Sequence, residues 1–244
     1  MRQRFAEFGV RPASELAAAT AAATETTARG RILPVLPDLA CRLPFGGLRR
    51  GSTVAVRGST ALLLSLLATA TTEGSWAGCV GLPDLGVLRA AELGVCVSRL
   101  ALVPDPGTAV TGTLAALLDG IDLVAVSSRI ALGSGDRGAV LAHRLSARAR
   151  NRGAVLLAFG AWPGADVELK CRATTWTGLE SGAGGLRECR MWIGVEGRGI
   201  PPASRRFSMT LSRAARPDSI GPDATGRDDH QDSGGMPRPM AAVG

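Results

Sequence analysis

Short apolar runs alternate with longer mixed stretches through the middle of the chain. The apolar runs are TVAVR (53–57), GCVGL (78–82), RLALV (99–103), IDLVAVS (121–127) and GAVLLAFG (153–160). They have the length and composition of buried strands, and the stretches between them are long enough for helices, at 60–73, 84–93, 108–119 and 136–152. Apolar strands separated by helices are typical of a parallel sheet covered on both faces. The pattern therefore predicts a three-layer α/β/α sandwich with a mostly parallel sheet.

Beyond residue 164 the pattern changes to strands without helices between them. Three segments, 167–176, 186–197 and 205–212, predict antiparallel strands at the edge of the sheet. The stretch GLESGAGG (178–185) predicts a flexible connection between the first two, because glycine and serine dominate it.

The two ends of the chain predict a different organisation. Residues 12–28 are rich in alanine and predict a helix, and residues 29–51 predict a connector, since they hold three prolines and a Gly-Gly turn. The last residues combine glycine, proline and scattered charges, which predicts a disordered tail. We therefore expect an N-terminal helix and connector, a core domain and a tail, at 1–45, 46–213 and 214–244.

Composition narrows the class of protein. The chain has 244 residues and a net charge of +7, carried by arginine with Lys170 as the only lysine. A GC-rich coding bias produces the same arginine excess, although the charge also suits an acidic partner such as DNA. Five widely spaced cysteines and two histidines argue against a zinc site and favour reduced thiols. No apolar stretch is long enough for a signal peptide or a membrane span, so we expect a cytoplasmic protein.

The stretch TVAVRGSTALLLSLL (53–67) predicts a strand, a glycine and a helix, the arrangement that surrounds a phosphate-binding loop. The pattern G-x-x-x-x-G-K-[ST], placed on residues 58–65, matches Gly58 and Ser65. Leu63 and Leu64 occupy the positions of the inner glycine and the lysine. Leucine offers neither the loop conformation nor the charge that holds the phosphates. Gly58 and Ser65 then either still hold an anion at a helix N-terminus or form a tight turn before a buried helix.

Two further parts of an ATP site are missing. Ser127 ends the strand 121–127, where an aspartate would hold magnesium. Asp84 is the acidic residue after the second strand, but it is out of register with an activating carboxylate. The sequence therefore predicts no cofactor, no metal, no catalytic residues and no enzymatic activity.

The segments FGGLRRGSTVAVRGS (45–59), ELGVCVSRLALVPDPG (92–107) and IDLVAVSS (121–128) resemble the ATPase core of RecA-type recombinases, over roughly residues 45–160. More narrowly, GLPDLG (81–86), LVPDPG (102–107) and FGAWPGADVELK (159–170) resemble the ImuA-type mutasome accessory proteins in their actinobacterial form. The resemblance implies a RecA-fold homologue with a degenerate P-loop that acts in the SOS response, in damage-induced mutagenesis and translesion DNA synthesis. It implies binding to a Y-family polymerase-like adaptor and, through it, to an error-prone replicative-type polymerase and the sliding clamp.

The leading hypothesis is thus a non-catalytic adaptor in translesion synthesis. One alternative is a RecA-like cell-division inhibitor of the SulA kind, which would bind a tubulin-like division protein. Another is a DNA-dependent ATPase or recombinase, which the missing lysine and carboxylates disfavour.

Two sets of residues are candidates for a surface that contacts a partner or DNA. Arg144, Arg148 and Arg152 are spaced to share one face of the helix 136–152, where they contact phosphates or an acidic partner, or else form a solvated outer face. Trp162 and Trp176 flank the first edge strand, and Trp192 lies in the next one. These rings either stack on bases or anchor a partner, or they pack in the core at the sheet edge.

Overall fold

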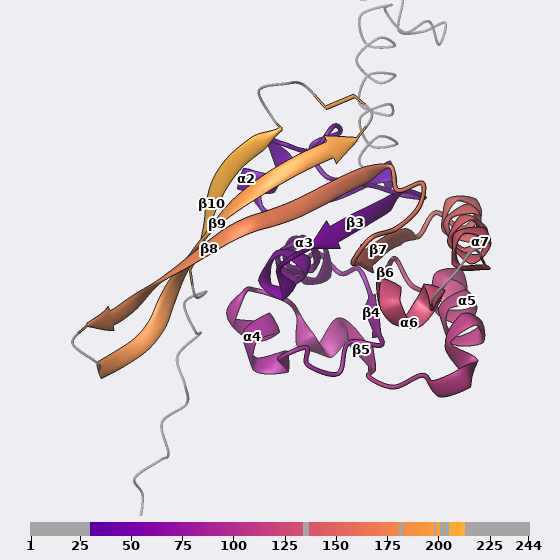
Figure 1. The fold of residues 1–244 in the computed structure, drawn as a ribbon, viewed down its shortest axis with the longest axis horizontal. Helices are drawn as coiled ribbons and strands as arrows, with labels where there is room; N and C mark the ends of the chain where they lie inside the picture. Colours follow the sequence, from indigo (N-terminus) through magenta and orange to yellow (C-terminus); the bar gives the residue numbers. More distant parts are fainter. Residues whose placement is uncertain (1–29, 134–136, 181–182, 198, 201–204, 213–244) are drawn as a thin grey trace, which may run out of the picture.

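The computed structural model describes residues 30–133, 137–180, 183–197, 199–200 and 205–212. The helix expected over 12–28 and the tail expected over 214–244 lie outside these residues. An eight-stranded sheet forms the centre of the molecule, and helices lie on both of its faces (Figure 1). The mostly parallel α/β sheet expected from the sequence is therefore confirmed.

The parallel part of the sheet is built from the apolar runs. Its strands are β3 (Thr53–Arg57), β4 (Ala77–Val80), β5 (Leu100–Val103), β6 (Leu123–Ser127) and β7 (Val155–Phe159). The order across the whole sheet is β10-β9-β8-β3-β7-β6-β4-β5. β3 lies in the interior of the sheet and pairs in parallel with β7 on one side and β8 on the other. Strands buried on both faces require apolar residues at nearly every position, which explains the continuous runs.

The sheet separates two hydrophobic cores. One core lies under α3 (Thr60–Thr72) and α4 (Val87–Glu92). The other core lies under α5 (Val110–Gly120), α6 (Ser128–Leu132) and α7 (Arg137–Arg152). Successive strand residues alternate between the cores, so Val54 and Val56 pack in the first and Ala55 in the second.

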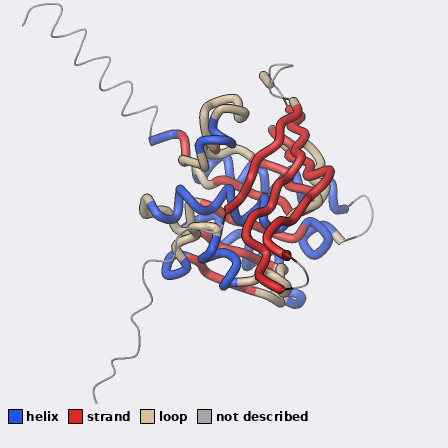
Figure 2. The backbone as a smooth tube through the Cα atoms, turned by 90° about the vertical axis from the view of Figure 1, so that its left-hand side faces the viewer, coloured by secondary structure: helices blue, strands red, loops and turns tan. Residues whose placement is uncertain are grey.

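The antiparallel part of the sheet is longer than the sequence predicts. It comprises β8 (Val167–Glu180), β9 (Ala183–Gly197) and β10 (Arg206–Ser212). For the described residues of 178–185, the expectation of a flexible connection is wrong, because strand pairing continues to Glu180 opposite Ala183; residues 181–182 lie outside the described residues. Backbone hydrogen bonds hold this pairing, and they do not depend on the weak strand preference of glycine and serine. The β8–β9 hairpin projects beyond the body of the molecule (Figure 1) and points toward the viewer in Figure 2.

The expected connector also contains ordered elements. β1 (Ile32–Leu33) pairs with β2 (Leu48–Arg49), and α2 (Pro37–Ala40) lies between them. Leu39 and Leu48 are buried in the same core as α3. Apolar residues of the expected connector therefore extend the core that also contains residues of the antiparallel strands.

None of the five cysteines is joined by a disulfide bond in this structure, and Cys79 and Cys189 are buried. Burial raises the pKa of the Cys79 thiol to about 12. Among the described residues, no three histidine, cysteine or acidic side chains group in a way that could hold a metal ion. Within the same residues, every helix is too short or too polar to cross a membrane.

Candidate functional site

The junction of β3 and α3 is a tight turn. β3 ends at Arg57 and α3 begins at Thr60, so only Gly58 and Ser59 connect them. Gly58 has a positive φ of 86°, and the Ser59 hydroxyl accepts a hydrogen bond of 3.3 Å from the backbone N–H of Leu62. Serine at this N-cap position satisfies one of the free N–H groups of the first helical turn. A turn this short cannot wrap backbone N–H groups around phosphates as a P-loop does.

The first turns of α3 are part of the core. Leu63 and Leu64, at the positions of the P-loop glycine and lysine, are 0% and 1% exposed. Ser65 is buried as well, and its hydroxyl donates a hydrogen bond of 2.7 Å to the carbonyl oxygen of Leu62. A serine hydroxyl committed to its own helix is not free to bind a magnesium ion. The matching glycine and serine thus serve a turn and a helix in this structure.

The backbone of strand β8 lies close to the Gly58–Ser59 turn. A Cβ atom on Gly58 would lie 2.5 Å from the carbonyl oxygen of Cys171. Glycine is required here because the turn combines a left-handed backbone with this close approach. The space beside the turn is therefore occupied by the backbone of β8.

A cleft of about 740 Å³ opens at the carboxyl ends of β3, β4, β6 and β7. This is the edge of a parallel α/β sheet where ligands commonly bind. Ser127 lies in the wall of the cleft, and no carboxylate replaces it on the described part of β6. The polar and charged residues that line the cleft are Arg57, Thr60, Asp84, Ser127, Ser128 and Arg129.

The carboxylates near the cleft do not form a magnesium site. Asp84 is exposed, and it is the only acidic residue in the described lining of the cleft. Asp122 lies at the opposite end of β6, where it accepts a hydrogen bond of 2.7 Å from Arg50 and another from the backbone N–H of Trp76. Asp122 therefore links Arg50, which precedes β3, to Trp76, which precedes β4. Chemically, the cleft offers hydroxyls and guanidinium groups that suit a small polar or anionic ligand.

The expected arginine face is partly neutralised. Arg148 binds both carboxylate oxygens of Asp119 on α5, at 2.9 and 2.6 Å, and Arg152 binds the same carboxylate at 3.1 Å. These hydrogen bonds lower the pKa of Asp119 below its usual value, with the Arg148 hydrogen bond as the largest cause. Arg144 is exposed. As a site for phosphates or an acidic partner, this face therefore has fewer free charges than the sequence predicts.

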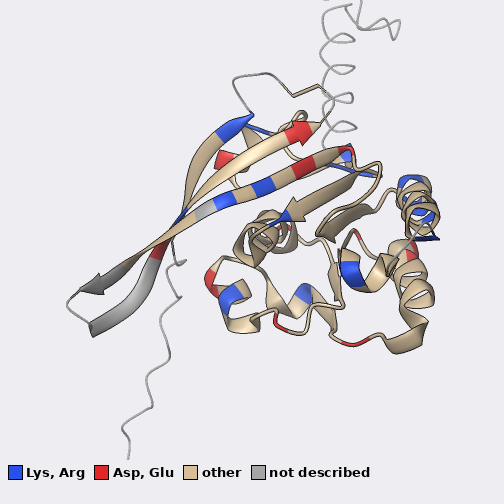
Figure 3. Ribbon diagram, in the orientation of Figure 1, with Lys and Arg blue, Asp and Glu red and all other residues tan. Residues whose placement is uncertain are grey.

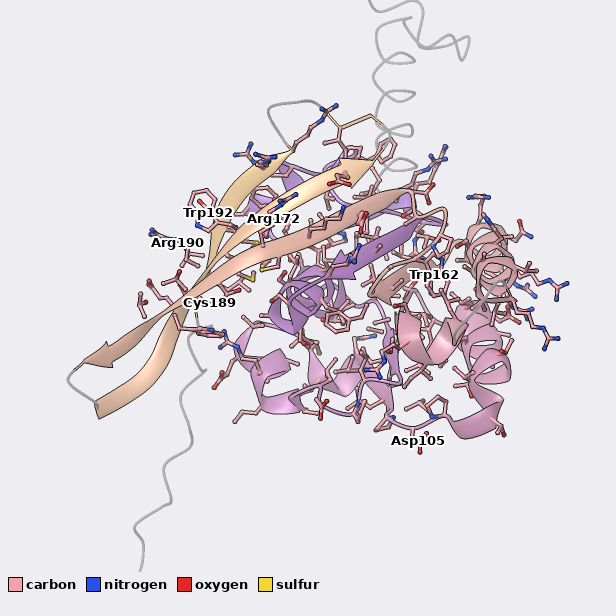
Figure 4. The ribbon with its side chains drawn as sticks, viewed as in Figure 1. Asp105, Trp162, Arg172, Cys189, Arg190 and Trp192 are labelled. Atoms are coloured by element: carbon pink, nitrogen blue, oxygen red, sulfur yellow. The ribbon has the colours of Figure 1, made fainter. Side chains whose placement is uncertain are left out.

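The tryptophans that the sequence singled out differ in burial: Trp162 is buried, whereas Trp176 is exposed. The inclusion of Trp162 in a contact surface is wrong: its ring is 6% exposed, and its Nε1 donates a hydrogen bond of 3.0 Å to Ser146 on α7 (Figure 4). α7 covers the loop after β7, so an apolar ring there packs inside. Trp176 is 41% exposed, with the guanidinium of Arg89 5.2 Å from its ring centre.

Sequence reasoning named Trp192 but missed the arginines that lie close to it. Trp192 is 53% exposed on β9, and Arg172 and Arg190 are exposed close to it (Figure 4). The alternation of polar and apolar residues in ECRMWIGV (188–195) was the available signal, because it predicts that Arg190 and Trp192 share one face of a strand.

Taken together, the fold and the site define a mostly parallel α/β domain with a ligand-sized cleft and no phosphate loop. The model of the MT3502 N-terminal domain family matches residues 42–164, and the chain belongs to this family. The match contains β3 to β7 and the whole lining of the cleft, and it ends before β8.

A curated relative is uncharacterized protein Rv3395c of Mycobacterium tuberculosis. It is 42% identical over 125 residues, which are 50% of this chain and 58% of the relative. The chain thus matches a little more than half of the length of that relative.

Proposed function

We propose that the protein is a non-catalytic accessory protein of the RecA-like ImuA type. In this proposal it acts in damage-induced translesion DNA synthesis by binding a Y-family polymerase-like adaptor. Through the adaptor it reaches an error-prone replicative-type polymerase and the sliding clamp. The observation that carries the proposal is the junction of β3 and α3, where a two-residue turn and buried leucines stand in place of a phosphate loop. An α/β domain with this junction is better suited to binding partners than to hydrolysing ATP.

The arrangement of the resembling segments supports the proposal. Segment 45–59 forms β2 and β3, segment 92–107 contains β5, and segment 121–128 contains β6. β3, β5 and β6 lie in one sheet, with parallel pairing throughout that part of it. The segments that carry the resemblance therefore belong to one structural unit.

An exposed apolar surface suits a protein partner. On α4, Leu88 is 70% exposed and Val87 is 44% exposed. The side chain of Arg89 reaches from α4 to the ring of Trp176 on β8, so the two elements adjoin here. Exposed apolar and aromatic side chains with an arginine among them are typical of binding hot spots. We assign the contact with the adaptor to this α4–Trp176 surface.

The first test is co-purification with a Y-family polymerase-like protein encoded in the same genome. We expect the wild-type chain to bind it and Leu88→Glu to weaken binding at least about fivefold, because a charge would be buried in an apolar contact. Val140→Glu is the matched control, since Val140 is 54% exposed on α7 in the other helical layer. Failure of the wild-type chain to bind would contradict the proposal. Binding to a tubulin-like division protein instead would support the cell-division alternative.

The second test concerns nucleotide. We expect no binding of Mg-ATP tighter than about millimolar, because each charge-assisted hydrogen bond that a P-loop would supply is worth about 1.5–3 kcal/mol. Isothermal titration calorimetry of the wild-type chain with Mg-ATP measures this directly. A dissociation constant in the micromolar range would overturn the non-catalytic assignment, and a steady release of phosphate would support the ATPase alternative.

A further inference from the structure

The antiparallel strands expose one face of the sheet. Their inward residues belong to the core beside α2 and α3, and include Leu169, Met191, Ile193, Val195, Phe207 and Met209. The residues between them point to the opposite side, and on β10 the burial alternates strictly from residue to residue. α5, α6 and α7 pack in the other core, whose strand residues come from β3, β4, β6 and β7. Within the described part of the chain, no helix contributes to a core on the outer face of β8, β9 and β10.

Trp192 lies in the middle strand of this open face. It is 53% exposed and stands opposite Ser208 of β10. The rings of Trp76 and Trp176 each lie near a guanidinium, from Arg99 and Arg89. Among the described residues, no guanidinium lies over the Trp192 ring. The exposed part of the ring is therefore available to an external ligand.

Three arginines surround Trp192 on the same face. Arg190 precedes it by two residues on β9, so both side chains point outward. Arg206 of β10 stands opposite Gly194. The Nε atom of Arg172 lies 3.4 Å from the position that a Cβ on Gly194 would take, which places Arg172 beside Trp192 (Figure 4). Within the described residues, none of these three arginines makes an ion pair.

The carboxylates of this face lie away from Trp192. Lys170 binds Glu196 at 2.8 Å and Glu168 at 3.3 Å, and Arg57 binds Glu168 at 3.1 Å. These two basic and two acidic residues neutralise one another at one end of the strands. In Figure 3, basic and acidic positions lie next to one another along β8. Glu188 lies toward the other end, two residues from Arg190 on the side away from Trp192. The hydrogen bond from Lys170 is the largest cause that lowers the pKa of Glu196, and the charge of Arg172, acting at longer range, is one of the smaller causes. The positive charge of Arg190 and Arg206 is thus the least compensated, and it lies beside Trp192.

We propose that the outer face of β8–β10 binds single-stranded nucleic acid. A base stacks on Trp192, while Arg172, Arg190 and Arg206 pair with phosphates. Sheet faces with exposed aromatic rings serve as stacking platforms for unpaired bases, and the planar guanidinium fork matches phosphate oxygens. An acidic peptide would use the arginines but would leave the ring without a stacking partner. The platform lies outside the family-matched residues 42–164 and extends the proposed accessory role to direct contact with the DNA.

The test is fluorescence anisotropy with a labelled oligodeoxythymidine and the full chain, at two or more salt concentrations. We expect Trp192→Ala to weaken binding about tenfold and Trp192→Phe to retain most of the affinity, since the smaller ring still stacks. Arg190→Ala should weaken binding and lower the slope of log affinity against log salt by about 0.7, as expected for one lost phosphate contact.

Matched variants separate this surface from general basicity. Trp76→Ala removes another exposed tryptophan, and Arg144→Ala removes an exposed arginine of α7; both should leave the affinity within about twofold. Circular dichroism confirms that each variant is folded. The proposal is overturned by absence of binding at low salt, by equal losses in Trp192→Ala and Trp76→Ala, or by a wild-type chain that binds polyglutamate as tightly as the oligonucleotide.

Discussion

Leu64→Lys is expected to lower the free energy of unfolding by about 4 kcal/mol or more, and not to create a nucleotide site. The substitution restores the lysine of the P-loop pattern in sequence. In the structure, however, the Leu64 side chain is 1% exposed and packs in the core beside β3 and β4. An ammonium group there has no partner, so the helix must shift or the lysine must lose its proton. Urea unfolding followed by circular dichroism gives the change in stability.

Leu88→Lys is the matched control for this prediction. It makes the same chemical change at a leucine that is 70% exposed on α4, so its effect should stay within about 0.5 kcal/mol. If Leu64→Lys unfolded at the same urea concentration as Leu88→Lys and bound Mg-ATP with micromolar affinity, a functional phosphate loop would have to lie at this junction.

Gly58→Ala is expected to destabilise the fold by about 3 kcal/mol or more, through two additive effects. The first is backbone strain, since a φ of 86° is unfavourable for any residue with a Cβ. The second is steric, because the new Cβ would lie 2.5 Å from the carbonyl oxygen of Cys171. Relieving that contact moves β8 away from β3, and this weakens a pair of strands in the interior of the sheet.

Gly94→Ala measures the backbone strain without the steric contact. Gly94 has nearly the same φ, 88°, but a Cβ there would lie 3.9 Å from the Ala68 side chain, an ordinary contact. We expect it to cost about 1–2 kcal/mol. Equal losses of stability in the two variants would mean that the Cys171 carbonyl does not restrict the turn at Gly58. The turn would then have room to open around a ligand.

Much of the central sheet could be predicted because the signals are local. The run at 53–57 became β3 without change, and the helix expected over 60–73 became Thr60–Thr72. Each buried strand must be apolar along its length, so its residues alone identify it. The hairpin is the counterexample: the pairing of Glu180 with Ala183 is held by backbone groups, and the glycine-rich sequence gives no sign of it.

For the candidate site, the sequence alone predicted only which residues of an ATP site are missing. The leucines at positions 63 and 64 and the serine at 127 can be read directly from the sequence as departures from an ATP site. The cleft could not, because its walls come from four strand ends that only the fold brings together. The ion pairs of Asp119 could not be predicted either, because this carboxylate partly neutralises Arg148 and Arg152 from a different helix.

The sequence by itself determined the class of fold and the absence of the phosphate-binding residues, since both depend on residue type and spacing along the chain. Only the tertiary structure decided which aromatic rings are available for binding. Trp162 follows a strand but is covered by α7, whereas Trp192 lies on a strand whose outer face lacks a described helix. The exposure of a side chain depends on which distant elements pack over it, and local sequence does not encode that contact.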